Sequence, residues 1–159
     1  MIRTGFLIKS MGASQQAVYL VSEMNVLVAQ EPNHSVCAFY RNPDPLTIQP
    51  LFALLSVYDA WSFDGIAIAT DIDSAEILLK CPSPKKKFFY VWDMEWTLKD
   101  HFKFKEMNHI YNNPELELIA RSESHYDIIK RLWKKPITII NEYNNEQIAS
   151  FLKEQSEEI

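Results

Sequence analysis

The sequence predicts one α/β domain of the Rossmann-like, doubly wound kind, in which helices cover both faces of a mostly parallel sheet. Short apolar runs alternate with amphipathic stretches along the chain, at the spacing of strand–helix–strand units. Such units form right-handed crossovers, which make neighbouring strands parallel. The chain has 159 residues, the size of one domain, and 47% of them are hydrophobic. We therefore predict a three-layer domain over residues 1–141 and a C-terminal helix over 142–159.

Six segments rich in aromatic, β-branched and other apolar residues are predicted to be strands. In chain order they are Arg3–Lys9, Ser35–Tyr40, Gly65–Thr70, Lys87–Trp92, Glu117–Arg121 and Pro136–Asn141. Gly65–Thr70 is almost wholly apolar, as strands buried on both faces are. The proline-containing segment Arg41–Pro50 predicts a loop. Leu51–Tyr58, which follows it, fits either a buried strand or a short helix.

Helices are predicted between these strands, each beginning at a residue that can cap it. The expected starts are Ser14 (to about Val28), Asp73 with Glu76 as a capping box (to Lys80), Thr97 with Asp100 (to about Tyr111) and Ser124 (to Trp133). In the C-terminal segment, Ile148, Phe151 and Leu152 form one apolar stripe on a chain rich in glutamate. This acidic helix is expected to pack on the domain or extend from it.

Composition excludes several classes of function. The net charge of −5 argues against a sequence-independent grip on nucleic-acid phosphates. Cys37 and Cys81 are the only cysteines; they form neither a disulfide framework nor a zinc motif, which favours a reduced compartment. The longest uncharged run, Pro45–Tyr58, is too short to span a membrane. We therefore expect a cytoplasmic protein that has no transmembrane segment and binds no nucleic acid.

Cofactor and metal motifs are missing from the sequence. No glycine-rich dinucleotide turn, P-loop or nucleophile elbow occurs. The four histidines lack metal-ligand spacing, and Asp71-Ile72-Asp73 lacks the rest of a calcium loop. No cofactor and no metal site are expected. The basic run Lys85–Lys87 indicates a solvated turn, with contact to a phosphate or an anionic lipid as the alternative.

Polar residues follow four of the predicted strands, and ligands of parallel sheets bind outside the carboxyl ends of the strands. In chain order these residues are Gly12 and Ser14, then Asp71 and Asp73, then Asp93 and Glu95, then Ser122, Glu123 and Ser124. The topology predicts that all of them lie at one edge of the sheet.

Each of these residues also has a purely structural interpretation. Ser14, Asp73 and Ser124 are accounted for as helix caps, and Gly12 either serves a tight turn or lets a ligand approach the backbone. Asp93 and Glu95 are not needed as caps if the next helix begins near Thr97. They either lie in a solvated loop or act on a ligand, by hydrogen-bonding sugar hydroxyls or by acting as a general base.

Two stretches that span most of the chain resemble a known family. Asp64–Trp96 combines a strand ending in Ala69-Thr70, a helix, a basic turn and a strand that runs into Trp92-Asp93-Met94-Glu95. It is similar to the middle of the N-terminal domain of GT-B glycosyltransferases of the family 4-like, rhamnosyltransferase-like kind, with Trp92 in place of a glutamine. Leu118–Asn141 resembles the segment leading to their second domain, with Ile140 in place of a proline.

The resemblance implies the acceptor-side half of a glycosyltransferase. Asp93 and Glu95 would then position or deprotonate an acceptor hydroxyl. The residues expected to bind the acceptor are Gly12, Ser14, Asp71, Ser122 and Glu123. The residues with which the family's second domain binds a nucleotide sugar have no counterpart here, so the chain alone is expected to transfer nothing.

Three arrangements and one rival interpretation stay open at this point. The chain could belong to a split enzyme with a donor-domain partner chain, be a domain of a longer protein, or be a non-catalytic relative. An uncovered face would also favour a homo-oligomer. The rival interpretation is a binding or structural module without any chemistry, which docks a partner through the sheet edge or the C-terminal helix.

Overall fold

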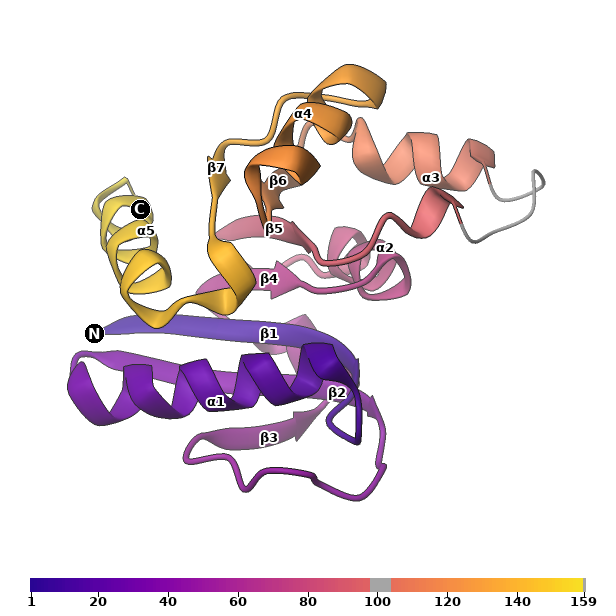
Figure 1. Ribbon diagram of the computed structural model, residues 1–159. Coiled ribbons are helices and arrows are strands. Elements are labelled where there is room, and N and C mark those ends of the chain that lie inside the picture. Colours follow the sequence, from indigo (N-terminus) through magenta and orange to yellow (C-terminus); the bar gives the residue numbers. More distant parts are fainter. Residues whose placement is uncertain (98–103, 159) are drawn as a thin grey trace.

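The computed structural model describes residues 1–97 and 104–158, and within them the predicted fold class is confirmed. One seven-stranded sheet has the order β3-β2-β1-β4-β5-β6-β7, and every neighbouring pair is parallel (Figure 1). The strands are β1 (Ile2–Ser10), β2 (His34–Asn42), β3 (Ala53–Ser56), β4 (Ile66–Ala69), β5 (Lys86–Val91), β6 (Glu117–Ala120) and β7 (Thr138–Ile139).

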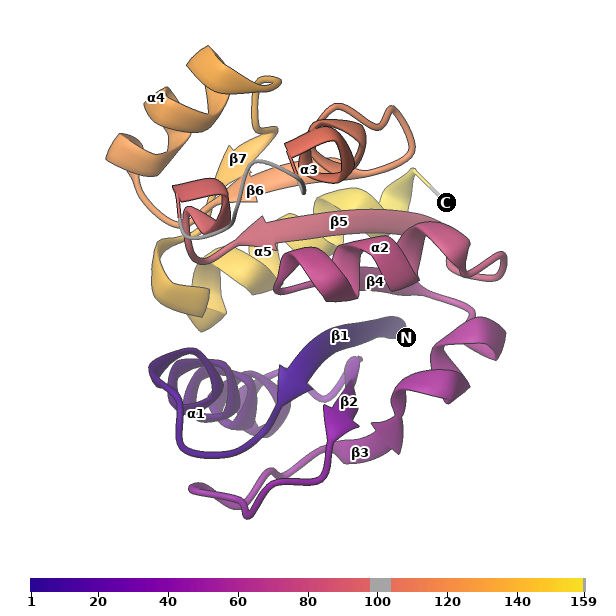
Figure 2. The ribbon, with the colours of Figure 1, turned by 90° about the vertical axis from the view of Figure 1, so that its right-hand side faces the viewer.

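Helices cover both faces of this sheet, giving three layers. The α-helices are α1 (Gln15–Gln30), α2 (Ile72–Lys80), α3 (Phe104–Tyr111), α4 (Glu123–Leu132) and α5 (Asn145–Glu157). Short 3₁₀ helices are η1 (Val57–Ser62), η2 (Glu95–Thr97) and η4 (Asn141–Tyr143). One core cluster joins α1 and α5 to the sheet, and a second joins α2, α3 and α4 to its other face (Figures 1 and 2).

The alternation of side chains along a buried strand builds these two clusters. In β4 all four residues are buried. Ile66 and Ile68 belong to the cluster under α1 and α5, while Ala67 and Ala69 belong to the cluster under α2 and α3. Successive side chains of a strand point to opposite faces, so a strand that is apolar throughout supplies both cores. This explains why Gly65–Thr70 reads as a continuous apolar run.

The C-terminal helix α5 packs on the domain. Its apolar stripe, including Ile148 and Leu152, is buried. The ring of Phe151 meets that of Phe88 edge-on at 5.0 Å between centroids. The Asn145 side chain donates to Glu23 of α1 over 2.7 Å.

Two helices begin at caps other than those predicted. Asp71, not Asp73, caps α2, and its carboxylate accepts from the Ser74 amide over 2.9 Å. Asp73 lies inside the first turn and forms an ion pair with Arg41 of β2 at 3.7 Å. Each preceding strand ends earlier than its apolar run suggests, so the helix also begins earlier.

The same displacement occurs at α4, where Ser122 is the cap and Ser124 lies inside the helix. The Ser122 hydroxyl accepts from the His125 amide over 3.3 Å. Ser122 itself has an extended backbone with φ −163°, as N-cap residues usually do.

Three other segments refine the predictions. Leu51–Tyr58 holds a strand and the start of a short helix, since β3 leads directly into η1. The strand is not buried as predicted, because β3 is mostly exposed at the sheet edge. The last strand is shorter than Pro136–Asn141 and covers only Thr138–Ile139. Thr97 ends η2, and α3 begins at Phe104; Asp100, its expected partner in starting the helix, lies outside the described residues. In the described parts of the chain, no helix combines the length and the apolar character needed to cross a membrane.

Replacing the α4 cap tests where this helix begins. Ser122→Ala removes the acceptor for the His125 amide, so we expect the free energy of unfolding to fall by about 1 kcal/mol. Ser124→Ala is the matched comparison: it removes only the contact of the Ser124 hydroxyl with the Ser122 hydroxyl, at 3.1 Å, and keeps the cap, so it should change the free energy of unfolding by less than about 0.5 kcal/mol. Urea denaturation measures both; equal losses in the two variants would contradict this cap assignment.

A buried histidine predicts acid sensitivity. Burial lowers the pKa of His34 below its ordinary 6.5, with Lys153 and the N-terminal amine acting in the same direction and Glu31 opposing them. As the pH falls through 6.5, the unfolded chain binds the proton first, so the free energy of unfolding decreases until the folded-state pKa is reached.

We expect His34→Leu to lose less stability than the wild type between pH 7 and pH 5.5. Part of the loss should remain, because burial also lowers the pKa of His125. Urea denaturation at several pH values measures the slope. The same slope in both proteins would exclude a contribution from His34.

Candidate functional site

The sheet order places a topological switch point between β1 and β4. From β1 the chain moves outward to β2 and β3, and then returns to form β4 on the other side of β1. Loops therefore diverge above the carboxyl ends of β1 and β4, which is where open parallel sheets bind ligands. The predicted site residues Gly12, Ser14 and Asp71 belong to these two loops.

The turn after β1 is held against the loop that follows β2. The Ser10 hydroxyl donates to Asp44, and the Gly12 amide donates to the Ser10 hydroxyl over 3.0 Å. A Cβ added to Gly12 would lie 2.9 Å from the Asp44 Cβ. Gly12 does not adopt a positive φ. A glycine is therefore required here by the close approach of Asp44, which occupies the space around its Cα.

Three of the predicted site residues are helix N-caps, namely Ser14, Asp71 and, as described above, Ser122. Ser14 accepts from the Ala17 amide over 3.1 Å at the start of α1. Asp71 accepts from both the amide and the hydroxyl of Ser74, at 2.9 and 2.6 Å. Each holds a helix N-terminus at the carboxyl edge of the sheet.

The two acids after β5 have different surroundings. The Glu95 carboxylate accepts from the Ile72 amide over 2.8 Å and so caps α2 from a neighbouring loop. Asp93 is exposed and forms no hydrogen bond or ion pair with another residue in the described parts of the chain. A carboxylate at the carboxyl edge without such a structural role can accept hydrogen bonds from a ligand.

A basic residue that the sequence analysis did not select lies beside these acids. Arg121, directly after β6, donates to the Trp92 carbonyl over 3.2 Å, and its guanidinium carbon lies 4.4 Å from the Trp92 ring centroid. Predicted site residues Ser122 and Glu123 follow it, and Glu123 is exposed in the first turn of α4. The sequence analysis counted Arg121 as the last residue of the predicted strand Glu117–Arg121, and only the shorter β6 of the structure places it in the loop.

A buried tyrosine packs on the core side of the loops at the carboxyl edge. Tyr143 is stacked against Trp92 and Tyr90, at centroid distances of 5.3 and 4.1 Å. Its backbone is left-handed, with φ 60°, a conformation that is rare and costly outside glycine. Gln16 of α1 donates both to the Tyr143 hydroxyl, at 3.1 Å, and to the Thr70 carbonyl, at 2.6 Å. One amide thereby joins α1, η4 and the residue that follows β4 at the switch point.

Burial raises the pKa of Tyr143 well above its ordinary value, and the charges of nearby Tyr90, Asp71 and Asp93 act in the same direction. The phenol is therefore neutral. The pKa of His125, a second shifted group near the edge, is lowered by burial and by the positive charge of Arg121. A hydrogen bond with the Val91 carbonyl and the charge of Asp93 oppose this shift. Neither residue was selected from the sequence, where nothing distinguishes it from a core residue.

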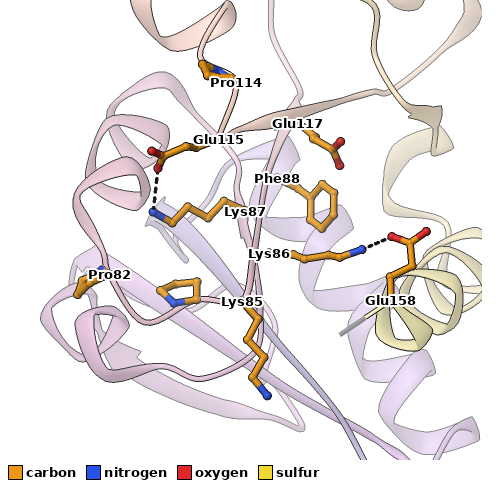
Figure 3. A pocket seen from close by; sticks show the side chains of 10 residues that line it. Pro82, Lys85, Lys86, Lys87, Phe88, Pro114, Glu115, Glu117 and Glu158 are labelled. Carbon is orange, nitrogen blue, oxygen red and sulfur yellow. Dashed lines mark hydrogen bonds and ion pairs between the residues drawn. The ribbon is translucent and has the colours of Figure 1, made fainter.

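The opposite edge of the sheet contains a cavity of about 480 Å³ around the basic run Lys85–Lys87. The prediction of a solvated turn is wrong for this run, because Lys86 and Lys87 begin β5 and are only partly exposed. Figure 3 shows Lys86 and Lys87 turned toward Glu158 and Glu115, respectively. Lys85 forms an ion pair with Asp64 at 3.5 Å. Each lysine of the run thus has an acidic partner, and the charges around this cavity compensate one another.

The carboxyl edge thus collects every predicted site residue, namely Gly12, Ser14, Asp71, Asp93, Glu95, Ser122 and Glu123. Among the described residues, no three histidine, cysteine or carboxylate side chains gather as metal ligands would. The chain matches no protein-family model, and no curated protein matches it significantly. The roles of these residues therefore remain predictions that depend on their geometry.

The free energy of unfolding of two variants distinguishes the roles of Glu95 and Asp93. Glu95→Ala leaves the Ile72 amide without its acceptor, so we expect the free energy of unfolding to fall by about 1 kcal/mol. Asp93→Ala removes no hydrogen bond and should change it by less than about 0.5 kcal/mol. Urea denaturation compares the two; a larger loss for Asp93→Ala would show that we have exchanged their roles.

Proposed function

We propose that this chain is the acceptor-binding domain of a glycosyltransferase of the GT-B type. In such an enzyme, a donor domain outside these 159 residues would hold the nucleotide sugar above the carboxyl edge. The observation that carries the proposal is the exposed Asp93 carboxylate, at an edge where the neighbouring acids Asp71 and Glu95 serve as caps. The resemblance of Asp64–Trp96 to this family supports it.

Asp93 has the chemistry that an acceptor site requires. A carboxylate can orient a sugar hydroxyl by accepting its hydrogen bond and can take its proton during transfer. The hydroxyl oxygen then bonds to the anomeric carbon of the donor as the bond to the nucleotide phosphate breaks, and that phosphate leaves with the electron pair. Glu95, predicted as a second catalytic acid, is better explained as a positioning residue, because its carboxylate already binds the start of α2.

A second candidate function, a binding module without chemistry, has one specific observation in its favour. Two carboxylates of the edge, Asp71 and Glu95, bind the α2 N-terminus. An edge whose acids mainly stabilise loops could recognise a partner without catalysing a reaction. The two functions differ in whether Asp93 influences the binding of a sugar hydroxyl.

We expect glycoside binding to depend on Asp93. In a titration with a panel of methyl glycosides, followed by amide chemical shifts, Asp93→Asn should weaken binding about 10-fold, since a charged acceptor is replaced by a weaker one. Glu117→Gln is the control, because Glu117 is an exposed acid at the start of β6 and lies at the opposite edge. Calorimetry with UDP-, GDP- and dTDP-sugars should show no binding tighter than millimolar.

Two results would overturn the proposal. One is micromolar binding of a nucleotide sugar to this chain, which would assign it the donor side. The other is glycoside binding that Asp93→Asn and Glu117→Gln leave equally unchanged, which would favour the non-catalytic module.

A further inference from the structure

A small cavity of about 180 Å³ adjoins the switch point, above the carboxyl ends of β1 and β2. We call it the β2–β3 pocket, since the connection between these strands forms one side of it. Its apolar wall comes from Met11, Tyr40, Leu46 and Leu54. None of these residues was expected to bind anything on sequence grounds.

The strand register explains why these side chains meet. Leu54 of β3 is the register partner of Ala38 in β2. Ala38, Tyr40 and Asn42 are every second residue of β2, so their side chains point to one face of the sheet, the same face as Leu54. This is the face of the α1 core cluster, against which Tyr40 and Leu54 pack and to which Met11 belongs. Leu46, on the connection that follows β2, is 41% exposed and lines the same pocket.

Two polar side chains give the pocket its chemical character. Asp44 is fixed by the hydroxyl of Ser10, which donates to its Oδ2 atom. Its second carboxylate oxygen, and the side-chain amide of Asn42, form no hydrogen bond with any other residue that the structure describes. The pocket therefore combines an apolar wall with acceptors and a donor for one or two hydroxyl groups, as sites for small amphipathic ligands do.

The size of the pocket and its distance from Asp93 limit the ligand. Pockets for drug-sized ligands hold roughly 300–1,000 Å³, so this one has room for a single ring or a short alkyl chain. Neighbouring strands lie about 4.8 Å apart. Asp93 follows β5, which is two strands from β1 and three from β2. A ligand that reaches from the pocket to Asp93 must therefore span about 10–15 Å.

We propose that the β2–β3 pocket binds the apolar aglycone of a glycoside acceptor, a single aryl ring or short alkyl group, while the sugar part extends across β1 and β4 toward Asp93. This inference rests on the proposed function and narrows it. The acceptor is an amphipathic glycoside, and a free sugar lacks the group that the pocket holds. Asp44 and Asn42 then bind the hydroxyl groups nearest the aglycone.

The methyl group of Met11 reports on the pocket directly. In protein labelled with [¹³C-methyl]methionine, Met11→Leu assigns its signal among those of the five methionines. Phenyl β-D-glucopyranoside should shift this signal in a saturable way, and glucose at the same concentration should not. The opposite result, no shift with the phenyl glycoside or an equal shift with glucose, would overturn the proposal.

A matched pair of leucine variants tests the location. Leu46→Asp places a charge in the pocket and should weaken binding of the phenyl glycoside at least 10-fold. Leu51→Asp is the control, because Leu51 belongs to the same connection and is 67% exposed, but it does not line the pocket. Unchanged binding by Leu46→Asp, or an equal loss in Leu51→Asp, would contradict the assignment.

The same readout separates this inference from the proposed function. Asp93→Asn should leave the Met11 response to the phenyl monoglycoside within about 2-fold of wild type, because that probe does not reach β5. One outcome is a saturable Met11 shift together with methyl glycoside binding that Asp93→Asn does not change. It would support the aglycone pocket and contradict the proposed transferase function. The converse outcome is methyl glycoside binding that Asp93→Asn weakens, with no Met11 shift. It would support the proposed transferase function and contradict the aglycone site.

Discussion

The parallel direction of all seven strands is the constraint on which the rest of the structure depends. Because each strand runs the same way as its neighbours, every loop that follows a strand emerges at one edge. Residues as distant in sequence as Ser14 and Glu123 are thereby brought to the same edge of the sheet, at the carboxyl ends of the strands. An antiparallel β5 would have placed Asp93 at the other edge, where Lys85, Lys86 and Lys87 form ion pairs with acidic residues.

A network of polar contacts then fixes the loops at this edge. Gln16 joins α1 to Thr70 and Tyr143, Glu95 joins the loop after β5 to α2, and Ser10 joins the turn after β1 to Asp44. Each contact links segments that follow different strands. The stacked rings of Trp92 and Tyr143 support the loops from the core side. An edge held in this way offers a ligand a preformed surface, which lowers the entropic cost of binding.

Local sequence was sufficient to predict the fold class and most of the elements, because apolar runs and caps act over a few residues. Ser14 was correctly identified as a cap. Asp73 and Ser124 were not, since Asp71 and Ser122 compete for the same helix starts and the end of the preceding strand decides between them. The role of Glu95 could not be predicted, because its partner, the Ile72 amide, lies 23 positions earlier in the chain.

The most direct measurement of the central claim is a map of backbone amide shifts with an amphipathic disaccharide, phenyl β-maltoside. We predict that the shifted amides follow the carboxyl ends of β1, β2, β4 and β5, at residues 11–14, 42–46, 70–72 and 92–95. Shifts confined to residues 82–87 and 114–117, at the opposite edge, would contradict the account.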